Sequence, residues 1–524
     1  MPASSLPLPL LVLLATLPIL VVLYLMIGRH WGGSKAGPAG WLTAIVVSLL
    51  FFGAGLQLIW IASLKAVLLS LFVLYIIWMA LLLYHTVNDA GAITAIGQEM
   101  PGIAHGRAAQ ALLMAWIFGS FLQGATGFGV PAAVVAPLLV GIGFAATPAV
   151  VIALLGHTWA VTFGSLGSSF ISLIAATGLQ GTELADPVSA MLAVAALGSG
   201  LAILWIVDKQ SAVRRRGLFV SLLAVVMGGT QWLIARSGLY SLAALGGGLA
   251  GLLVAIPWLS RESIKKGAFE EGDSFAQRRN RLLTAFLPYG ILIGVVVFGM
   301  MIIPDLLDMV VISPKFPEIC TSFGVCTAEG PGRSINLFGH GGALLFYATV
   351  LIFLWYRWQG TLPTASTSEY SAKNILSKTI NGSIKPTIGI YTMVAMASIM
   401  EHAGMTQLLA NVLSQSGPLF PFLSPFIGAL GAFMTGSNTN SNVVFGELQK
   451  QTALTLSISV PIILAGQTAG GAIGSNFAPA KVIVGASTVA EADEGDVLKT
   501  LAKLGLIIIG VIGLVVWAAI ALSG

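Results

Sequence analysis

The sequence predicts an all-α polytopic membrane protein, and composition is the first observation that predicts it. Of the 524 residues, 56% are hydrophobic and only 9% are charged, and the mean hydropathy is +0.93. A water-soluble protein needs about a quarter of its residues charged. Apolar stretches of about 20 residues, enough to cross a bilayer as a helix, recur from end to end. We expect roughly 11 to 14 transmembrane segments, some of them re-entrant, near 6–28, 40–60, 66–86, 108–123, 131–155, 187–207, 218–236, 238–259, 284–304, 337–356, 386–404, 419–434, 453–475 and 501–522.

The placement of charge is the second observation. Basic residues gather in the loops 208–217, 260–282 and 357–385, which the positive-inside rule predicts to be cytoplasmic. The acid-rich loop 305–336 is then external, and the same count puts the N-terminus outside. No lysine or arginine precedes the first apolar run, so 6–28 is predicted to be a retained helix and not a cleavable signal. The net charge of +5 lies in these short loops and gives no indication of nucleic-acid binding.

Cys320 and Cys326, the only two cysteines, both lie in the loop predicted to be external. An external location permits oxidation, so we expect a Cys320–Cys326 disulfide. The competing interpretation, a metal or redox pair, needs more ligands than this loop offers.

An internal repeat is the third observation. The run Phe121-Leu-Gln-Gly-Ala-Thr-Gly-Phe-Gly129 resembles Phe433-Met-Thr-Gly-Ser-Asn-Thr-Asn-Ser441, and the offset is 312 residues (433 − 121). Gly156-His-Thr-Trp-Ala-Val-Thr-Phe-Gly-Ser165 likewise resembles Gly466-Gln-Thr-Ala-Gly-Gly-Ala-Ile-Gly-Ser475, with an offset of 310 (466 − 156). Gly, Ser and Thr are common in membrane helices, so one match alone is weak. Two blocks at nearly the same offset indicate a real repeat.

Both repeated segments place polar and glycine residues inside apolar runs, where they are expected to break helices. Broken helices are tolerated in a membrane only where protein or a water-filled cavity satisfies the freed backbone groups. Corresponding breaks in two halves indicate a binding site near the bilayer midplane. Helix N-termini at such breaks suit a carboxylate. An exposed turn is the alternative for the most polar patch, Gly436 to Asn442.

The repeat predicts two inverted halves, 1–260 and 284–524, joined by a cytoplasmic linker, 261–283. Each half would supply scaffold helices and one broken-helix segment, 108–177 in the first and 405–490 in the second. Their polar and glycine residues, with one nearby lysine, are the candidate substrate-binding residues: Gly124, Thr126, Gly127, Gly129, Thr158, Ser165, Ser437, Asn438, Thr439, Gln467, Thr468, Ser475 and Lys481.

These motifs resemble the lactate permease family. The resemblance rests on Gly124-Ala-Thr-Gly-Phe-Gly-Val-Pro131, Leu138 to Phe144, Gly436-Ser-Asn-Thr439 and Ala478 to Thr488, and it covers most of the chain. It implies import of L-lactate and related 2-hydroxymonocarboxylates, such as D-lactate and glycolate, by proton symport across a bacterial cytoplasmic membrane. It also implies that the protein belongs to a branch of the ion-coupled anion carriers. In these carriers hairpin tips contact the substrate and a transport domain slides like an elevator. Such relatives suggest a homodimer.

Proton symport calls for a titratable group near the site, and few candidates lie inside the membrane. His157 has an unperturbed pKa that suits a proton switch, although a neutral histidine bonded to a backbone carbonyl is the alternative. Glu447 is the second candidate, but it could pair with Lys450 three residues on and be structural. Lys481 could meet the carboxylate or snorkel from a helix end. Asp89, Glu401 and His402 stand at predicted span ends and are expected to be solvated.

Other function classes lack their motifs. The spans contain no His-Glu-x-x-His, no paired aspartates and no Gly-x-Ser-x-Gly elbow, so no enzyme, metal or cofactor is expected. A nucleotide-driven pump would need a phosphate-binding loop that the sequence does not have. A sodium-coupled mono- or dicarboxylate transporter remains the main alternative, because carbonyls and hydroxyls at broken helices also bind sodium. An anion channel is the other.

Overall fold

Apolar helices carry the fold, as the composition predicts. The structure is a computed structural model that describes residues 6–29, 31–127, 129–265, 275–365, 370–489 and 491–523. Within these residues, ten helices are long and apolar enough to cross a membrane, or eleven if one bent pair forms a single span. The predicted class, a polytopic helical membrane protein, is confirmed. Part of the predicted linker, 266–274, lies outside the described residues.

The helices of the first half end in two long elements, α10 and α11. In order they are α1 (Leu8–Leu23), α2 (Gly33–Phe51), α3 (Leu56–Asp89), α4 (Ala92–Glu99), α5 (Arg107–Ala111), α6 (Gly119–Ala125), α7 (Val130–Gly141), α8 (Ala146–Gly156), α9 (Gly164–Thr177), α10 (Gly181–Arg236) and α11 (Tyr240–Lys265). A π-helical turn, Leu112–Phe118, joins α5 to α6.

The second half begins after the linker. Its helices are α12 (Phe275–Ile302), α13 (Pro304–Leu307), α14 (Gly341–Gln359), α15 (Ala372–His402), α16 (Met405–Leu413), α17 (Phe420–Thr435), α18 (Asn438–Thr455), α19 (Val460–Gly474), α20 (Pro479–Ala486) and α21 (Glu494–Ser523).

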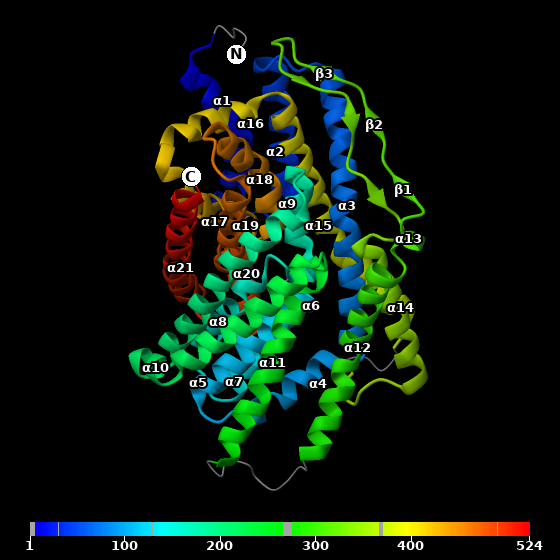
Figure 1. Cartoon of the computed structure of the whole chain (residues 1–524), viewed down its shortest axis with the longest axis vertical. Coiled ribbons are helices and arrows are strands. Elements are labelled where there is room, and N and C mark those ends of the chain that lie inside the picture. Colours follow the sequence, from blue (N-terminus) through cyan, green and yellow to red (C-terminus); the bar gives the residue numbers. More distant parts are fainter. Residues whose placement is uncertain are drawn as a thin grey trace.

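The two halves repeat the same order of elements. In each, a long helix turns through a left-handed glycine into a short amphipathic helix: α3 into α4 through Gly91, and α15 into α16 through Gly404. The offset is 313 residues (404 − 91), close to that of the sequence repeat. Gly91 contacts Thr364 in the α14–α15 connection, whereas Gly404 contacts Val325 in the α12–α14 connection. The short helices lie at opposite ends of the molecule (Figure 1), so the repeat is inverted.

Each half then forms a hairpin followed by a broken helix. The hairpins are α5–α6 with α7 and α17 with α18, and the broken helices are α8–α9 and α19–α20. In the first broken helix the backbone leaves helical geometry at Ser165–Gly167, and in the second a 3₁₀ turn, Ser475–Phe477, interrupts it. The two breaks are again 310 residues apart (475 − 165).

Helix α10 is two antiparallel helices joined by a tight turn, so the predicted connection between two spans is confirmed. The chain leaves helical geometry at Asp208 and Lys209 and reverses there. Trp232 accordingly donates to Asp186, and Gly228 lies against Ala193. The connection is shorter than the predicted loop 208–217, because 210–217 already belong to the second helix. This second helix and α11 have no counterpart following α21, so the correspondence of elements covers α1 to the turn in α10 and α12 to α21.

The helices pack in two groups. Helix α15 packs on α2 and α3, and α14 packs on α3 and α12, so these helices form one group. Helices α17, α18, α19 and α21 pack together and on α9 and α10, while α11 packs on α6 and α9. The two hairpins and the two broken helices thus belong to one body, which meets the first group mainly where α9 and α18 approach α3 and α15.

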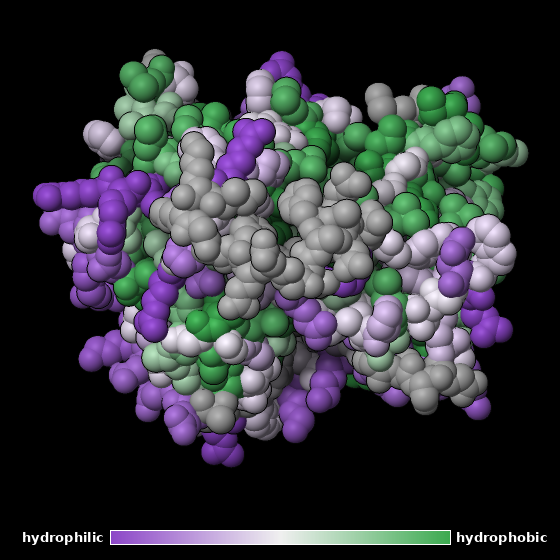
Figure 2. All heavy atoms as spheres, turned by 90° about the horizontal axis from the view of Figure 1, so that it is seen from below, coloured by the Kyte–Doolittle hydropathy of each residue, from purple (hydrophilic) through white to green (hydrophobic). Residues whose placement is uncertain are grey.

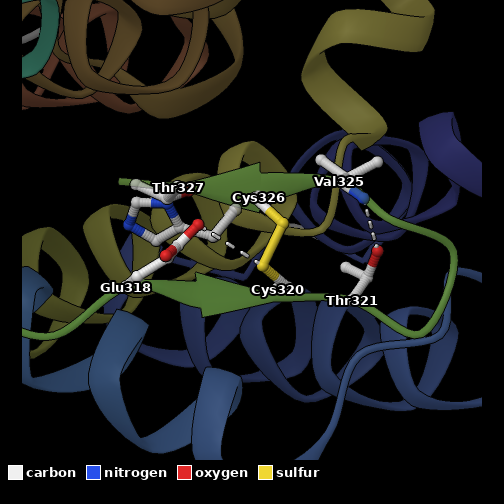
Figure 3. The surroundings of a disulfide bond; sticks show 7 residues. Glu318, Cys320, Thr321, Val325, Cys326 and Thr327 are labelled. Atoms are coloured by element: carbon white, nitrogen blue, oxygen red, sulfur yellow. Dashed lines mark hydrogen bonds between the residues drawn. A yellow bond between two sulfur atoms is a disulfide. The ribbon is translucent and has the colours of Figure 1, made fainter. Parts of the chain in front are cut away.

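A β arm occupies the segment between α12 and α14. Its six short strands pair antiparallel as nested partners: β1 (Val311–Ile312) with β6 (Ile335–Asn336), β2 (Lys315–Phe316) with β5 (Gly330–Pro331) and β3 (Ile319–Cys320) with β4 (Cys326–Thr327). A disulfide joins Cys320 to Cys326 near the tip of the arm (Figure 3). The arm runs along α3 in the half of the molecule that holds the N-terminus (Figure 1).

The C-terminal end of α11 and the N-terminal end of α12 lie at the opposite end of the molecule (Figure 1). Figure 2 shows this end from below, with hydrophilic side chains over much of the face and hydrophobic surface along its upper right edge. The turn in α10 lies at this end too, since Arg216 pairs with Glu262 near the end of α11. The described residues that follow α14 also lie away from the β arm, where Thr364 bonds to Gly91. The basic segments and the acidic one therefore lie on different sides. This is the arrangement that the positive-inside rule predicts.

Candidate functional site

The tip of the second hairpin presents a helix N-terminus inside the protein. Gly436 ends α17 with a φ of +67°, a conformation that glycine adopts without strain. Ser437 then caps α18, and its side chain accepts a hydrogen bond of 3.3 Å from the Asn440 backbone N–H. The first turn of α18, Asn438 to Ser441, is buried. The patch is therefore no exposed turn between two helices.

Two asparagines on one face of α18 tie the hairpin to both broken helices. Asn438 Nδ2 donates to the hydroxyls of Thr162 and Thr468, each at 3.2 Å. Asn442 Nδ2 donates to Thr468 Oγ1 and to the Ser169 carbonyl, each at 2.9 Å. Thr162 belongs to the first broken segment and Thr468 to the second, so this network joins the two halves of the chain.

The amide oxygens of this network face no donor. Asn438 Oδ1 and Asn442 Oδ1 are buried and have no hydrogen-bond partner among the described residues. Buried acceptors without a partner are costly and rare in folded proteins. These two oxygens therefore indicate a place where a substrate hydroxyl, a water molecule or a cation would bind.

The tip of the first hairpin lies against the first break. Gly127 has a φ of +68°, and a Cβ built on it would lie 1.6 Å from Ser165 Oγ. Gly129 has a φ of +85°, and a Cβ built on it would lie 3.6 Å from a methyl carbon of Val484 in α20. Gly436 of the second tip approaches Ala480 of the same helix. Both tips thus approach α20, the short helix after the second break.

The first break is held in an unusual backbone conformation. Ser165 and Leu166 have φ values of 49° and 57°, in the left-handed region that costs L-residues about 1–2 kcal/mol each. Leu166 is buried, and the Phe170 N–H bonds to the Thr162 carbonyl at 2.9 Å across the break. Such strain is found where the surrounding structure holds a functional geometry.

The second break carries the lysine of the site. Lys481 Nζ donates to Ser475 Oγ at 3.0 Å and to Asn476 Oδ1 at 3.4 Å, and no carboxylate of the described residues pairs with it. Asn476 also contacts His157, whose Nδ1 lies 2.8 Å from the Ala153 carbonyl. The structure brings His157, Ser475 and Lys481 into one cluster beside the tips.

The remaining candidates occupy supporting positions. Gly124 lies within α6, where a Cβ would meet the backbone of Leu245 in α11 at 2.4 Å. The hydroxyls of Thr126 and Thr158 bond to carbonyls of their own helices. Thr439 Oγ1 lies 3.0 Å from Ser169 Oγ, between α18 and α9. Gln467 bonds to Gln449 and to Ser441 behind the second hairpin.

Glu447 stands apart from His157 and Lys481. Lys450 Nζ lies 3.2 Å from its carboxylate and also donates to the Thr177 carbonyl at 2.8 Å. Gln451 Nε2 donates to the other carboxylate oxygen at 2.6 Å. This pairing is the structural alternative that the three-residue spacing suggested.

Two expectations of solvation are wrong. Asp89 is 2% exposed and lies 2.7 Å from Lys378 Nζ, so a buried carboxylate pairs with a partly exposed lysine between α3 and α15. His402 is 7% exposed, and its Nδ1 lies 2.9 Å from the Thr327 hydroxyl in the β arm. Glu401, by contrast, is exposed, and it lines a cavity. Each helix end is covered by a connection that is distant in the sequence.

Sequence reasoning missed three members of the network: Thr162, Ser169 and Asn442. The signal for Asn442 was present, because it follows Asn438 by four residues and so shares its helix face. Thr162 and Ser169 lie on either side of the first break, and only the tertiary contact of α9 with α18 reveals them.

Fold and site together define a class: a helical membrane transporter built from two inverted halves, whose breaks meet at one polar centre. Comparison with protein families identifies the family within this class. The family model described as L-lactate permease matches residues 11–523, and the chain belongs to this family. It is a multi-pass protein of the bacterial cytoplasmic membrane, as the sequence predicts.

Relatives match along nearly their whole length. A putative L-lactate permease of Haemophilus influenzae is 29% identical over 95% of this chain and 96% of that protein. An L-lactate permease of Escherichia coli is 26% identical, with 96% and 94% covered, and a glycolate permease of the same organism is 25% identical, with 96% and 94% covered. Among solved structures, the YdaH transporter of Alcanivorax borkumensis is similar, with a TM-score of 0.46 and 13% identity over 86% of this chain and 85% of that one.

Proposed function

We propose that this protein imports L-lactate and related 2-hydroxymonocarboxylates, D-lactate and glycolate among them, by proton symport. The observation that carries the proposal is the meeting of two hairpin tips and two helix breaks around one lysine. Relatives named L-lactate permease and glycolate permease support this substrate class.

The chemistry of the site suits a 2-hydroxymonocarboxylate. The N-terminus of α18 offers backbone N–H donors and a partial positive charge to a carboxylate. Lys481 adds a full positive charge near the second break, and no carboxylate of the described residues neutralises it. The free amide oxygens of Asn438 and Asn442 would accept a hydrogen bond from the 2-hydroxyl.

His157 is the proton carrier that the geometry favours. It contacts Asn476, which also bonds to Lys481, so its protonation would be felt at the site. Glu447 is less suited, because Lys450 and Gln451 already satisfy its carboxylate. Transport would follow an elevator motion, in which the body that holds both hairpins moves against α2, α3, α14 and α15.

Uptake of radiolabelled L-lactate into proteoliposomes tests the proposal. With an inward proton gradient and no sodium, we expect saturable accumulation that an uncoupler abolishes. His157→Ala should lose accumulation but keep lactate–lactate counterflow, which needs no net proton movement. Wild-type protein that takes up no lactate with either cation would contradict the proposed substrate.

Sodium coupling is the second candidate, and the same two amide oxygens favour it. Oxygen atoms of amides and hydroxyls near a helix break are ligands that bind Na⁺ in transporters. If uptake requires sodium and ignores the proton gradient, the cation belongs beside Asn438 and Asn442, and His157 is a neutral structural residue. Conductance without saturation would instead indicate a channel.

A further inference from the structure

A cavity of about 350 Å³ lies between the two groups of helices, apart from the polar centre. One wall comes from α3 and α15, and the other from the end of α9 and the middle of α18. Residues 331–333, at the end of β5 and directly after it, close the cavity. Its volume lies in the range of small-molecule sites. It lies on the side of the β arm, which the sequence predicts to be external.

Part of the charge in this cavity is neutralised. Glu447 pairs with Lys450 at 3.2 Å, and Lys450 also bonds to the carbonyl of Thr177 at the end of α9. His402 bonds through Nδ1 to the Thr327 hydroxyl. These groups hold α18, α9 and the arm in place and leave no net charge.

Lys65, Arg333 and Glu401 also line the cavity, and none of them forms an ion pair with a described residue. The Lys65 ammonium lies 5.7 Å from the centre of the Phe316 ring. Glu401 and Lys65 are close enough to interact electrostatically, but not within ion-pair distance. Two cations and one anion leave an excess of one positive charge.

Arg333 is the group that most lacks a partner. Its guanidinium carbon lies 3.9 Å from the centre of the Phe72 ring, within the distance of a cation–π interaction. Its Nε is buried and has no hydrogen-bond partner among the described residues. A planar guanidinium beside an aromatic ring and left with free donors matches the geometry of a carboxylate.

We propose that this cavity is an external capture site for monocarboxylate anions, in which Arg333 and Lys65 hold the carboxylate before it reaches the hairpin tips. The proposal rests on the proposed function, since lactate is its ligand. Val443 and Glu447 of α18 line the cavity, and the same helix begins at the tip, about one and a half to two and a half turns away. A positive cavity at the mouth of a pathway raises the local concentration of an anion and its association rate.

Initial rates of L-lactate uptake, at low and at high ionic strength, test the proposal. Arg333→Gln and Lys65→Gln should each raise KM about tenfold with little change in the maximal rate, and should weaken its dependence on salt. Glu401→Gln removes the opposing charge and should lower KM. Lys315→Gln, at an exposed position on β2 that does not line the cavity, is the matched control and should leave KM unchanged.

Arg333→Lys and Lys65→Arg keep the charge, so they serve as controls for misfolding of the glutamine variants. Lys65→Arg should keep KM within about threefold of wild type, whereas Arg333→Lys keeps the charge but loses the planar fork and should lie between wild type and Arg333→Gln. Unchanged KM in both glutamine variants, or a raised KM in Glu401→Gln, would overturn the capture site while leaving lactate transport intact. Wild-type protein without lactate uptake would instead overturn the proposed function.

Discussion

At the scale of single residues, the centre of this protein is a set of amides and hydroxyls with few charges. Asn438, Asn442, Thr162 and Thr468 exchange hydrogen bonds across the two halves. A buried arginine at the bilayer centre would be costly. Among the described residues, Lys481 at the second break, bonded to Ser475, is the cation that lies near the tips. Recognition by oriented dipoles avoids most of that cost.

Asn438→Ala tests this network. The change removes the two hydrogen bonds that the amide donates and the oxygen proposed to accept from the substrate, while Thr468 keeps its bond from Asn442. Uptake should therefore fall at least about tenfold, and stability should fall by no more than two hydrogen bonds contribute, about 0.5–1.5 kcal/mol each. Asn374→Ala, at an exposed position in the first turn of α15, is the control and should transport as wild type. Equal rates for the two variants would remove Asn438 from the site.

The environment of His340, a residue outside the transport site, predicts that the stability of the protein depends on pH. It caps α14, accepting from the Gly342 N–H at 3.1 Å, and it stacks on Tyr75. Burial of the ring, the larger cause, and the nearby positive charge of Arg333, the smaller one, lower the pKa of His340 from 6.5 to about 4. Between these values the unfolded chain binds a proton that the folded protein does not, so stability decreases as the pH falls from about 6.5 to about 4.

The loss amounts to a few kcal/mol at most, on the order of 3. His340→Asn keeps a side chain that can cap the helix and removes the titration. Thermal unfolding in detergent between pH 7 and 4 should therefore show a shallower decline for this variant than for the wild type. Identical pH profiles would show that His340 does not contribute.

At the scale of elements, the breaks and tips are where local geometry departs from the helix. Left-handed residues occur at both tips and at the first break, and the second break is a 3₁₀ turn. The two breaks stand 310 residues apart, whereas the matching motifs at the two tips stand 312 residues apart. The distance along the chain from tip to break therefore differs by two residues between the halves. Broken helices bring several backbone termini to one point, which continuous helices cannot do.

Gly127→Ala tests the packing of the first tip. The new Cβ would overlap Ser165 Oγ, and the positive φ is strained for alanine. We expect a lower unfolding temperature and loss of uptake. Gly229→Ala in α10 is the matched control, because its Cβ would have no atom within 4 Å and its backbone is helical. That variant should be as stable as wild type or slightly more stable. Normal uptake by Gly127→Ala would show that the tip tolerates a different shape.

At the scale of the whole molecule, inversion places equivalent elements at opposite ends. Gly91 meets the connection after α14, and Gly404 meets the β arm. The Asp89–Lys378 ion pair stabilises the first of these contacts, and the hydrogen bond between His402 and Thr327 stabilises the second. The group of helices around α3 and α15 is thus anchored at both ends, as a scaffold for a moving body would need to be.

Single-cysteine labelling tests this topology. Both natural cysteines are joined in a disulfide, so an introduced cysteine is the reactive thiol. Lys315→Cys on the β arm should react with a membrane-impermeant maleimide in intact cells. Arg214→Cys, exposed after the turn in α10, should react only in inside-out vesicles. Reaction of both variants from the same side would contradict the predicted sidedness.

The sequence by itself determined the class of protein and the position of its breaks. Hydropathy decides membrane insertion because the bilayer acts on composition and length, and the motif repeat located Ser165, Ser437 and Ser475 because local polarity interrupts an apolar helix wherever it folds. The sequence also determined the placement of charge, since positive loops stay on one side.

Only the tertiary structure decided which residues meet. Thr162 and Asn442 became partners because α9 and α18 pack together, a contact between segments far apart in the chain. Asp89 is buried rather than solvated, because α15 brings Lys378 to it. The connection predicted at 208–217 is a tight turn at Asp208 and Lys209, because 210–217 form a helix that satisfies its own backbone groups even where its side chains are charged.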